Sequence, residues 1–226
     1  MPFTLEKIVP WGRSFDEYVK MFNLTKQDLK LSILGCADGP SSFNHVMNKL
    51  GNKVTSIDPI YQFSKQQIES RIEASYEKVM DQMRQNANDY VWDSIESLEM
   101  LGQIRMTAMK EFISDFDTGK IEGRYFAECL PSLSFQDKQF DIALCSHFLF
   151  LYSDQLSLDF HLDSIQEMYR TAKEVRIFPL LDLGCKKSPF IDIILEKLEQ
   201  SGYIVEIIEV PYQFQCGGNE MMRICR

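Results

Sequence analysis

The spacing of apolar and polar residues predicts helices at the start of the chain. Ser14 lies three residues before Glu17, and Thr25 lies three residues before Asp28. Both pairs have the spacing of a capping box, in which the two side chains satisfy backbone N–H groups at a helix start. We therefore expect residues 1–28 to be mainly helical.

After residue 28 the apolar period changes. "LKLSIL" (29–34) has the composition of a short buried strand, and "KVTSID" (53–58) has that of a second one. Between them, "FNHVMNKLG" (43–51) places apolar residues on one helical face and ends in Gly51, a residue that favours helix termination. Strand, turn, helix and strand form a βαβ unit, which predicts a parallel sheet with a right-handed crossover.

The strand pattern then stops, and residues 64–118 form a predicted helical insertion. Ser64 and Gln67 have capping-box spacing, and apolar residues recur every three or four positions from Ile68 to Met83 and from Trp92 to Phe112. This insertion could be a lid, an oligomer surface or an element with a purely structural packing role. It is the surface on which a homodimer could form.

Strand patterns return in the second half of the chain. They cover residues 124–130, 140–148 and 174–183, followed by a helix that opens at Ser188 and Pro189 and runs to Gly202. Segments 203–210 and 220–225 close the chain as antiparallel strands joined through "CGGN". The whole chain, residues 1–226, is predicted to be one α/β domain.

Charge and cysteine usage narrow the functional classes. The net charge is −9, and the longest basic cluster is the pair Lys186–Lys187, so we expect neither nucleic acid nor a membrane surface as partner. The six cysteines and three histidines show no metal-ligand spacing, and a metal site is not expected. The cysteine pattern, with no signal peptide or apolar span recognised, favours the cytoplasm.

The stretch "ILGCADGP" (33–40) holds the candidate chemistry. A turn between a buried strand and a helix start offers backbone N–H groups, and its small residues allow a ligand to approach closely. Asp58 ends the next strand 19 residues after Gly39, close to the spacing of nucleoside and dinucleotide binders. Simple packing is the alternative. Pro40 disfavours a nicotinamide-dependent oxidoreductase, because a third glycine is expected near that position.

Several segments together resemble the class I S-adenosylmethionine (SAM)-dependent methyltransferases. They are "LSILGCADGPSSF", "VTSIDPIYQFS", "LSFQDKQFDIALCSHFLFLYSDQL" and "MYRTAKEVRIFPLL". With "GRSFDEY" near the start and "GGN" near the end, the chain resembles an uncharacterised bacterial branch of that superfamily. The resemblance implies a doubly wound, Rossmann-like, seven-stranded sheet with an antiparallel last strand, a helical insertion after the second strand, and an N-terminal helical cover over the cofactor.

The same resemblance implies a cofactor site that binds SAM. Its glycine loop would consist of Gly35, Cys36, Ala37 and Gly39, and Asp58, followed by Pro59, would bind the ribose. Ser146 and His147 would lie near the methionine part. Ile33 stands where many members have an acid, and Asp38 is the nearest carboxylate that could replace it.

Other candidate residues come from single positions. Arg13 could hold the cofactor carboxylate or remain solvated beside Asp16. The resemblance implies that Glu128, near the end of the third strand, reaches the adenine amino group. His147 is a weak candidate for a catalytic base, whereas Tyr152 and Arg176 are candidate substrate contacts. For Arg176, a buried pair with a carboxylate is the alternative.

The sequence favours methyl transfer to an unidentified, small-molecule acceptor. The altered glycine loop and the lack of a clear catalytic residue leave a second hypothesis, a catalytically silent SAM-binding regulatory or interaction protein with the same fold.

Overall fold

The structure, a computed structural model, describes residues 9–225. Its strands are β1 (Ile33–Cys36), β2 (Val54–Ile57), β3 (Tyr125–Phe126), β4 (Phe140–Ser146), β5 (Ala172–Phe178), β6 (Ile204–Glu209) and β7 (Glu220–Cys225). Its α-helices are α1 (Phe15–Met21), α2 (Phe43–Lys49), α3 (Lys65–Gln85), α4 (Leu98–Ile121), α5 (Leu158–Thr171) and α6 (Ile191–Gln200). Four short 3-10 helices are η1 (Asp28–Lys30), η2 (Pro59–Gln62), η3 (Ala87–Asp89) and η4 (Phe150–Tyr152).

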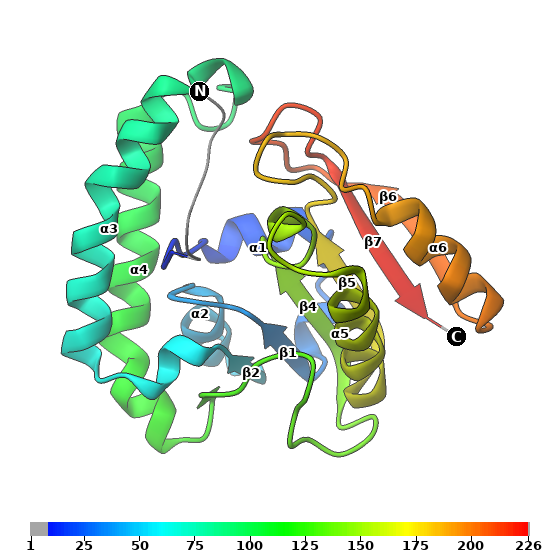
Figure 1. The fold of residues 1–226 in the computed structure, drawn as a ribbon. Helices are drawn as coiled ribbons and strands as arrows, with labels where there is room; N and C mark the ends of the chain where they lie inside the picture. The colour runs from blue at the N-terminus through cyan, green and yellow to red at the C-terminus, as the bar shows by residue number, and fades with distance from the viewer. Residues whose placement is uncertain (1–8, 226) are drawn as a thin grey trace.

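The strands form one seven-stranded sheet in the order β3-β2-β1-β4-β5-β7-β6 (Figure 1). Strands β1 to β5 are parallel to one another, whereas β7 runs antiparallel to both β5 and β6. The predicted doubly wound sheet with an antiparallel last strand is confirmed. The strand order reverses direction between β1 and β4, and in open α/β sheets ligands bind at the carboxyl ends beside such a point.

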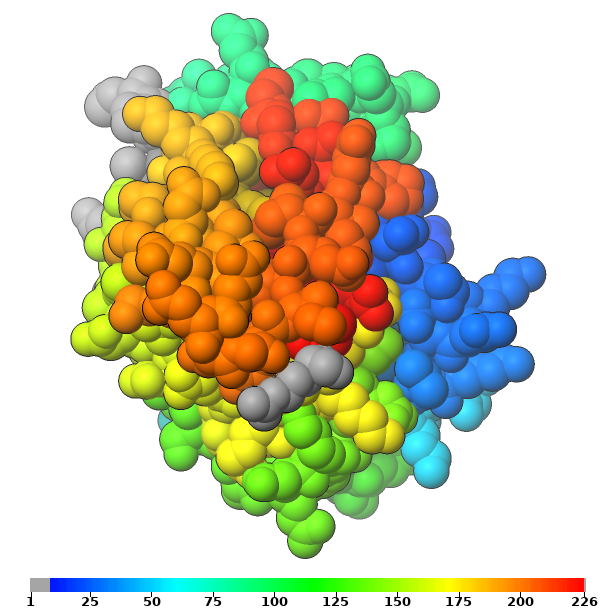
Figure 2. Space-filling model, turned by 90° about the vertical axis from the view of Figure 1, so that its right-hand side faces the viewer, coloured from blue at the N-terminus to red at the C-terminus, as the bar shows by residue number. Residues whose placement is uncertain are grey.

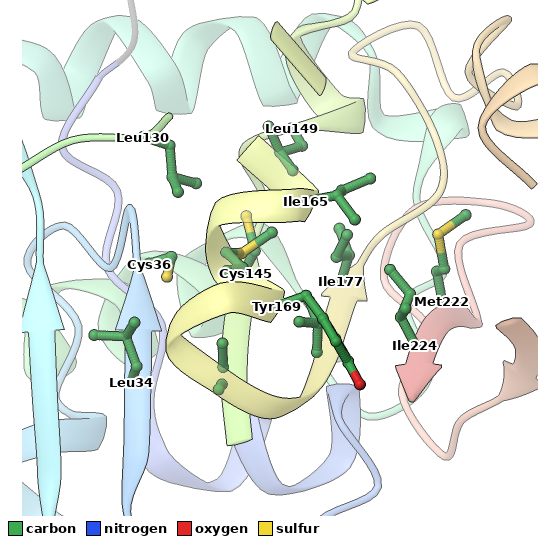
Figure 3. Close-up of a cluster of buried hydrophobic side chains, with 14 of the residues drawn as sticks. Leu34, Cys36, Leu130, Cys145, Leu149, Ile165, Tyr169, Ile177, Met222 and Ile224 are labelled. Atoms are coloured by element: carbon green, nitrogen blue, oxygen red, sulfur yellow. The ribbon is translucent and has the colours of Figure 1, made fainter. Parts of the chain in front are cut away.

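The main core lies under α5, on one face of the sheet. Figure 3 shows Leu34, Cys36, Cys145 and Ile177 from three parallel strands in one apolar cluster, with Ile165 of α5 packed on it. Close packing of these side chains fixes the strand ends, and therefore the loops that follow them.

Some element bounds differ from the expectation. Strand β3 covers two residues of the expected 124–130, because the chain leaves the sheet after Phe126 and forms an isolated bridge between Cys129 and Ser132. The pair Thr25 and Asp28 exchanges capping hydrogen bonds as expected, but the helix that follows is only η1. Helix α5 was not predicted, since its buried face mixes His161, Ser164 and Thr171 with the apolar residues.

The expected helical insertion is present, and the segment of the expected N-terminal cover contains helix α1. Helix α1 begins with the predicted capping box of Ser14 and Glu17, and the first eight residues of the expected cover lie outside the described residues. Helices α3 and α4 form a hairpin beside the β3 edge of the sheet (Figure 1). Arg124 holds the base of this hairpin through two 2.8 Å hydrogen bonds to Asp115 of α4.

The other end of the hairpin is bound to the β6–β7 loop. Val91 donates its N–H to the Phe214 carbonyl at 2.7 Å, and Cys216 donates its N–H to the Asp89 carbonyl at 2.9 Å. The expected "CGGN" turn is thus part of a ten-residue connection, residues 210–219, that leaves the sheet to reach the insertion. Figures 1 and 2 show the two segments side by side.

A buried ion pair joins three segments that are distant in sequence. Arg105 of α4 is fully buried and pairs with Glu17 of α1, whose other carboxylate oxygen accepts a 2.8 Å hydrogen bond from the Tyr212 hydroxyl. Burial alone would raise the pKa of Glu17, but Arg105 and the neighbouring Arg13 lower that pKa to about 2. The carboxylate therefore stays charged and holds α1, the insertion and the β6–β7 loop together.

None of the helices within residues 9–225 is both long enough and apolar enough to cross a membrane.

Replacing Glu17 by Gln tests this junction. The neutral amide leaves the Arg105 guanidinium buried without its counter-charge, and we expect the free energy of unfolding to fall by about 3–5 kcal/mol. The matched control is Asp81→Asn, which breaks an exposed pair with Arg84 and should change stability by less than about 0.5 kcal/mol. Urea unfolding measures both. Equal losses in the two variants would show that the buried pair does not hold the junction.

Candidate functional site

A pocket of about 380 Å³ lies along the carboxyl edge of the sheet. Its walls come from the N-terminal segment, the glycine turn, the ends of β2, β3, β4 and β5, helix α3 and the β6–β7 loop. Nine of the predicted site residues line it: Arg13, Ala37, Gly39, Asp58, Pro59, Glu128, Ser146, His147 and Tyr152. Three do not line it: Gly35, Cys36 and Arg176.

The glycine turn is built around a buried carboxylate. Ala37 and Gly39 both have a φ of 54°, a left-handed conformation that is uncommon for alanine. Asp38, between them, accepts hydrogen bonds from the hydroxyls of Tyr18 at 2.6 Å and Ser56 at 2.5 Å. Burial raises the pKa of Asp38, while these two donors oppose that rise. Side chains of α1 and β2 thus stabilise the unusual backbone of the turn through their hydrogen bonds to Asp38.

Gly35 leaves room for the Asp38 carboxylate and does not line the pocket. A Cβ at position 35 would lie 2.1 Å from Oδ2 and 2.5 Å from Cγ of Asp38. The expected contact of Gly35 with the cofactor stays a prediction. Glycine is needed there because Asp38 occupies the space of a side chain.

Asp58 joins the end of β2 to the glycine turn. Its Oδ2 accepts the Gly39 N–H at 3.0 Å, and its Oδ1 accepts the Ile60 N–H at 2.8 Å, which caps η2. Each carboxylate oxygen can accept a further hydrogen bond. Burial raises the pKa of Asp58 to about 6, although the two backbone N–H groups oppose the shift. The carboxylate is held in place and faces the pocket.

Arg13 brings to the pocket a positive charge that forms no ion pair within the described residues. Its carbonyl accepts hydrogen bonds from the Ser42 N–H and the Ser41 hydroxyl, both at 3.1 Å, which fixes the backbone beside the start of α2. Nη1 donates to the Trp11 carbonyl at 2.8 Å, and buried Nε has no partner in the described chain. Burial, followed by the charge of Arg105, lowers the pKa of Arg13 to about 10. Arg13 remains a cation, and a carboxylate ligand would complete its hydrogen bonding.

His147 follows β4 with a φ of 51°. Its backbone N–H donates to the Phe178 carbonyl at 2.7 Å, and Nδ1 of its ring lies 2.9 Å from Oγ of Ser146. Burial lowers the pKa of His147 well below its usual value, and the charges of Arg13 and Arg105 add to this effect. The imidazole is therefore neutral near pH 7 and is a weak base.

Glu128 and Tyr152 also line the pocket. Glu128 accepts hydrogen bonds from the N–H and the hydroxyl of Ser134. Burial raises the pKa of Tyr152 to about 12, so its phenol stays protonated at neutral pH. Neither residue supplies a strong base.

The structure places Cys36 and Arg176 elsewhere. Cys36 is buried in the apolar cluster under α5, as Figure 3 shows, because its side chain alternates away from the pocket along β1. Arg176 donates to Glu174 Oε1 at 2.6 Å and to the Phe22 carbonyl at 2.8 Å. Neither residue lines the pocket, and Arg176 forms the carboxylate pair that was the alternative for it.

Several lining residues were missed by sequence reasoning. They are apolar or aromatic residues from distant segments: Trp11, Tyr18, Val79, Met83, Tyr90, Leu183 and Phe214, together with Gln215. The apolar period of α3 pointed to Val79 and Met83 as core residues. No local signal distinguishes a core position from a pocket wall that is packed on the core.

Within residues 9–225, no group of three or more His, Cys, Asp or Glu side chains is arranged to hold a metal ion.

Comparison with known proteins identifies a relative over nearly the full length. The chain is 36% identical over 223 residues to the uncharacterized protein MJ0045 of Methanocaldococcus jannaschii, covering 98% of each sequence. The chain belongs to the same family as that protein. No protein-family model matches the chain.

Solved structures similar to the chain were also found. Magnesium protoporphyrin IX methyltransferase (ChlM) from Synechocystis PCC 6803, with bound SAM, is 12% identical with a TM-score of 0.47, covering 94% of this chain and 77% of that one. A SAM-dependent methyltransferase from Aquifex aeolicus is 14% identical with a TM-score of 0.42, covering 93% and 87%.

The steric role of Gly35 gives a direct test. Gly35→Ala places a methyl group on the Asp38 carboxylate, and we expect a loss of about 1–3 kcal/mol in the free energy of unfolding. In an Asp38→Ala background the same change should cost at least about 1 kcal/mol less, because the obstructing carboxylate is absent. Urea unfolding of the four proteins gives this coupling. Additive losses would mean that Asp38 is not what excludes a side chain at position 35.

Proposed function

We propose that this protein is a SAM-dependent methyltransferase that acts on a small molecule. The observation that carries the proposal is the position of Asp58: a carboxylate at the end of β2, tied to the glycine turn by Gly39, that lines the same pocket as the cation Arg13. A ligand that joins a nucleoside to an amino acid needs both groups: a carboxylate for the ribose hydroxyls and a cation for the amino-acid carboxylate. The resemblance of several segments to class I methyltransferases supports the same reading.

The residues present fit SAM at three points. The Asp58 carboxylate has remaining acceptor capacity for the ribose hydroxyls, and Arg13 has a buried Nε without a partner for the methionine carboxylate. Glu128, from the loop after β3, lines the pocket where it could accept from the adenine amino group. Ala37 and Gly39, with left-handed backbones, leave the turn open to close approach.

When bound, SAM supplies an activated methyl group on its sulfonium. The chain's own residues would then orient donor and acceptor and exclude water, which accounts for much of the rate increase in reactions that need only alignment. His147, neutral and fixed by Phe178 and Ser146, would position ligands rather than remove a proton efficiently. Tyr152 would contact the acceptor beside it.

Cellular setting and assembly are part of this proposal. We place the protein in the cytoplasm and expect no nucleic acid or membrane partner, on the basis of the net charge of −9 and the cysteine pattern. A homodimer through the helical insertion remains a prediction.

A SAM-binding protein without turnover is the second candidate. The observation in its favour is that His147 is a weak base and that Tyr152 stays protonated, so neither of these two residues is a strong proton acceptor. Transfer of radiolabelled methyl groups from SAM to any member of a broad small-molecule collection would exclude it. Binding without transfer would support it.

The cofactor site is tested by titrating ligand-free protein with S-adenosylhomocysteine (SAH) in a calorimeter. We expect micromolar binding, and at least a tenfold loss for Asp58→Ala, because the ribose hydroxyls lose a charged acceptor worth about 1.5–3 kcal/mol. The control is Asp154→Ala, an exposed carboxylate outside the pocket, which should bind like the unaltered protein. Absence of SAH binding to the unaltered protein would overturn the proposal.

The raised pKa of Asp58 predicts a pH dependence of the same binding. The charged carboxylate binds the ribose, so protonation near pH 6 competes with SAH. We expect affinity to be constant above about pH 7 and to fall about tenfold by about pH 5, one unit below that pKa. Asp58→Asn should bind more weakly but with no such dependence. A fall of equal size in both proteins would assign the effect to another group.

A further inference from the structure

The pocket has two ends that differ in charge. The charged lining residues, Arg13, Asp38, Asp58, Arg71 and Glu128, come from the N-terminal segment, the β2 and β3 side of the sheet and the first half of α3. At the other end the lining residues are Val79, Met83, Tyr90, Leu183, Phe214 and Gln215, none of which carries a charge. We call this second set the roof end.

Helix α3 runs along the pocket and connects the two ends. It begins directly after η2, next to Asp58, and Arg71 in its first half packs over the Phe63 ring at 3.8 Å. From Arg71 to Met83 the helix advances about 18 Å, at 1.5 Å per residue. Val79 and Met83 therefore lie well away from the residues that would hold the nucleoside, and Figure 1 shows α3 rising from beside β2 to the β6–β7 loop.

The roof end is a built wall rather than a chance gap between loops. Phe214 stacks on Tyr90 with ring centroids 4.8 Å apart, and Tyr90 pairs with Gln215 in an isolated β-bridge. Leu183 donates its N–H to the Leu151 carbonyl at 3.1 Å, which brings the loop after β5 against η4. Three segments that are distant in sequence are thus fixed around one apolar space.

The Gln215 amide in this wall has its donor side committed, whereas its Oε1 is buried and has no partner in the described chain. Gln215 donates through Nε2 to the Asp182 carbonyl at 3.3 Å and to Sγ of Cys185 at 3.5 Å, and these acceptors fix the orientation of its amide. A charged ligand here would lose its hydration and find no counter-charge among the described lining residues, which costs much more than burying an apolar group. An apolar ring would instead contact the Tyr90, Phe214 and Met83 side chains.

We propose that the roof end is the acceptor subsite and that the acceptor is an uncharged, mainly apolar or aromatic small molecule held against Met83, Tyr90 and Phe214. This inference rests on the proposed function, because it takes the charged end as the cofactor site. It assigns acceptor selection to the helical insertion and the β6–β7 loop.

The test uses protein saturated with SAH, so that Arg13 is engaged and the charged end is filled. Indole is the probe, and indole-3-carboxylate is the charged probe of similar shape. We expect calorimetric titration to show millimolar indole binding and at least tenfold weaker binding of indole-3-carboxylate. Indole that does not bind, or a carboxylate that binds as tightly, overturns the inference.

Two variants locate the binding. Met83→Gln should weaken indole at least fivefold while SAH affinity stays within twofold, because the polar amide disrupts the apolar wall only at the roof end. Ile121→Gln, at an exposed apolar position on α4, should leave both unchanged. Equal indole binding to Met83→Gln and the unaltered protein would place the probe elsewhere and overturn the inference. If the unaltered protein does not bind SAH, the proposed function is overturned. If it binds SAH but not indole, only the inference about the acceptor subsite is overturned.

Discussion

The buried pair of Glu17 and Arg105 is the contact on which the pocket depends. Its members come from α1 and α4, and Tyr212 adds the β6–β7 loop, so one carboxylate joins three of the segments that build or support the walls. A buried ion pair contributes little net stability compared with apolar packing, but losing one partner is costly. Such a contact selects one arrangement of the segments, because any other would leave a charge buried alone.

The same pair determines the electrostatics of the charged end. Glu17 is saturated with donors from Ser14, Arg105 and Tyr212, whereas buried Nε and Nη2 of Arg105 have no partner in the described chain. Positive charge from Arg105 therefore extends toward Arg13 and His147, and it contributes to the lowered pKa of both. In a protein with a net charge of −9, this local excess favours an anionic group beside Arg13.

Features of the fold that depend on residues close together in the sequence could be predicted from the sequence. The βαβ unit, the capping box of α1 and the position of Asp58 after β2 follow from spacing within about 30 residues. The reason for Gly35 could not be read this way, since it depends on how Asp38 turns under the loop toward Tyr18 and Ser56. The partner of Arg176 is likewise set by the contact of β5 with the residues after α1.

The two ends of the pocket differ because different forces hold their walls in place. At the strand ends, backbone N–H groups are free to bind carboxylates, so half-buried Asp58 has one hydrogen bond on each oxygen and still lines the pocket. The roof is held by backbone hydrogen bonds between residues 89–91 and 214–216 and by stacked rings. These contacts need no polar side chain. Phe214 follows Tyr90 by more than 120 residues, so the sequence alone does not show that the two rings are partners. A charged end and an uncharged end of the pocket thus follow from the sheet edge on one side and the contact between residues 89–91 and the β6–β7 loop on the other.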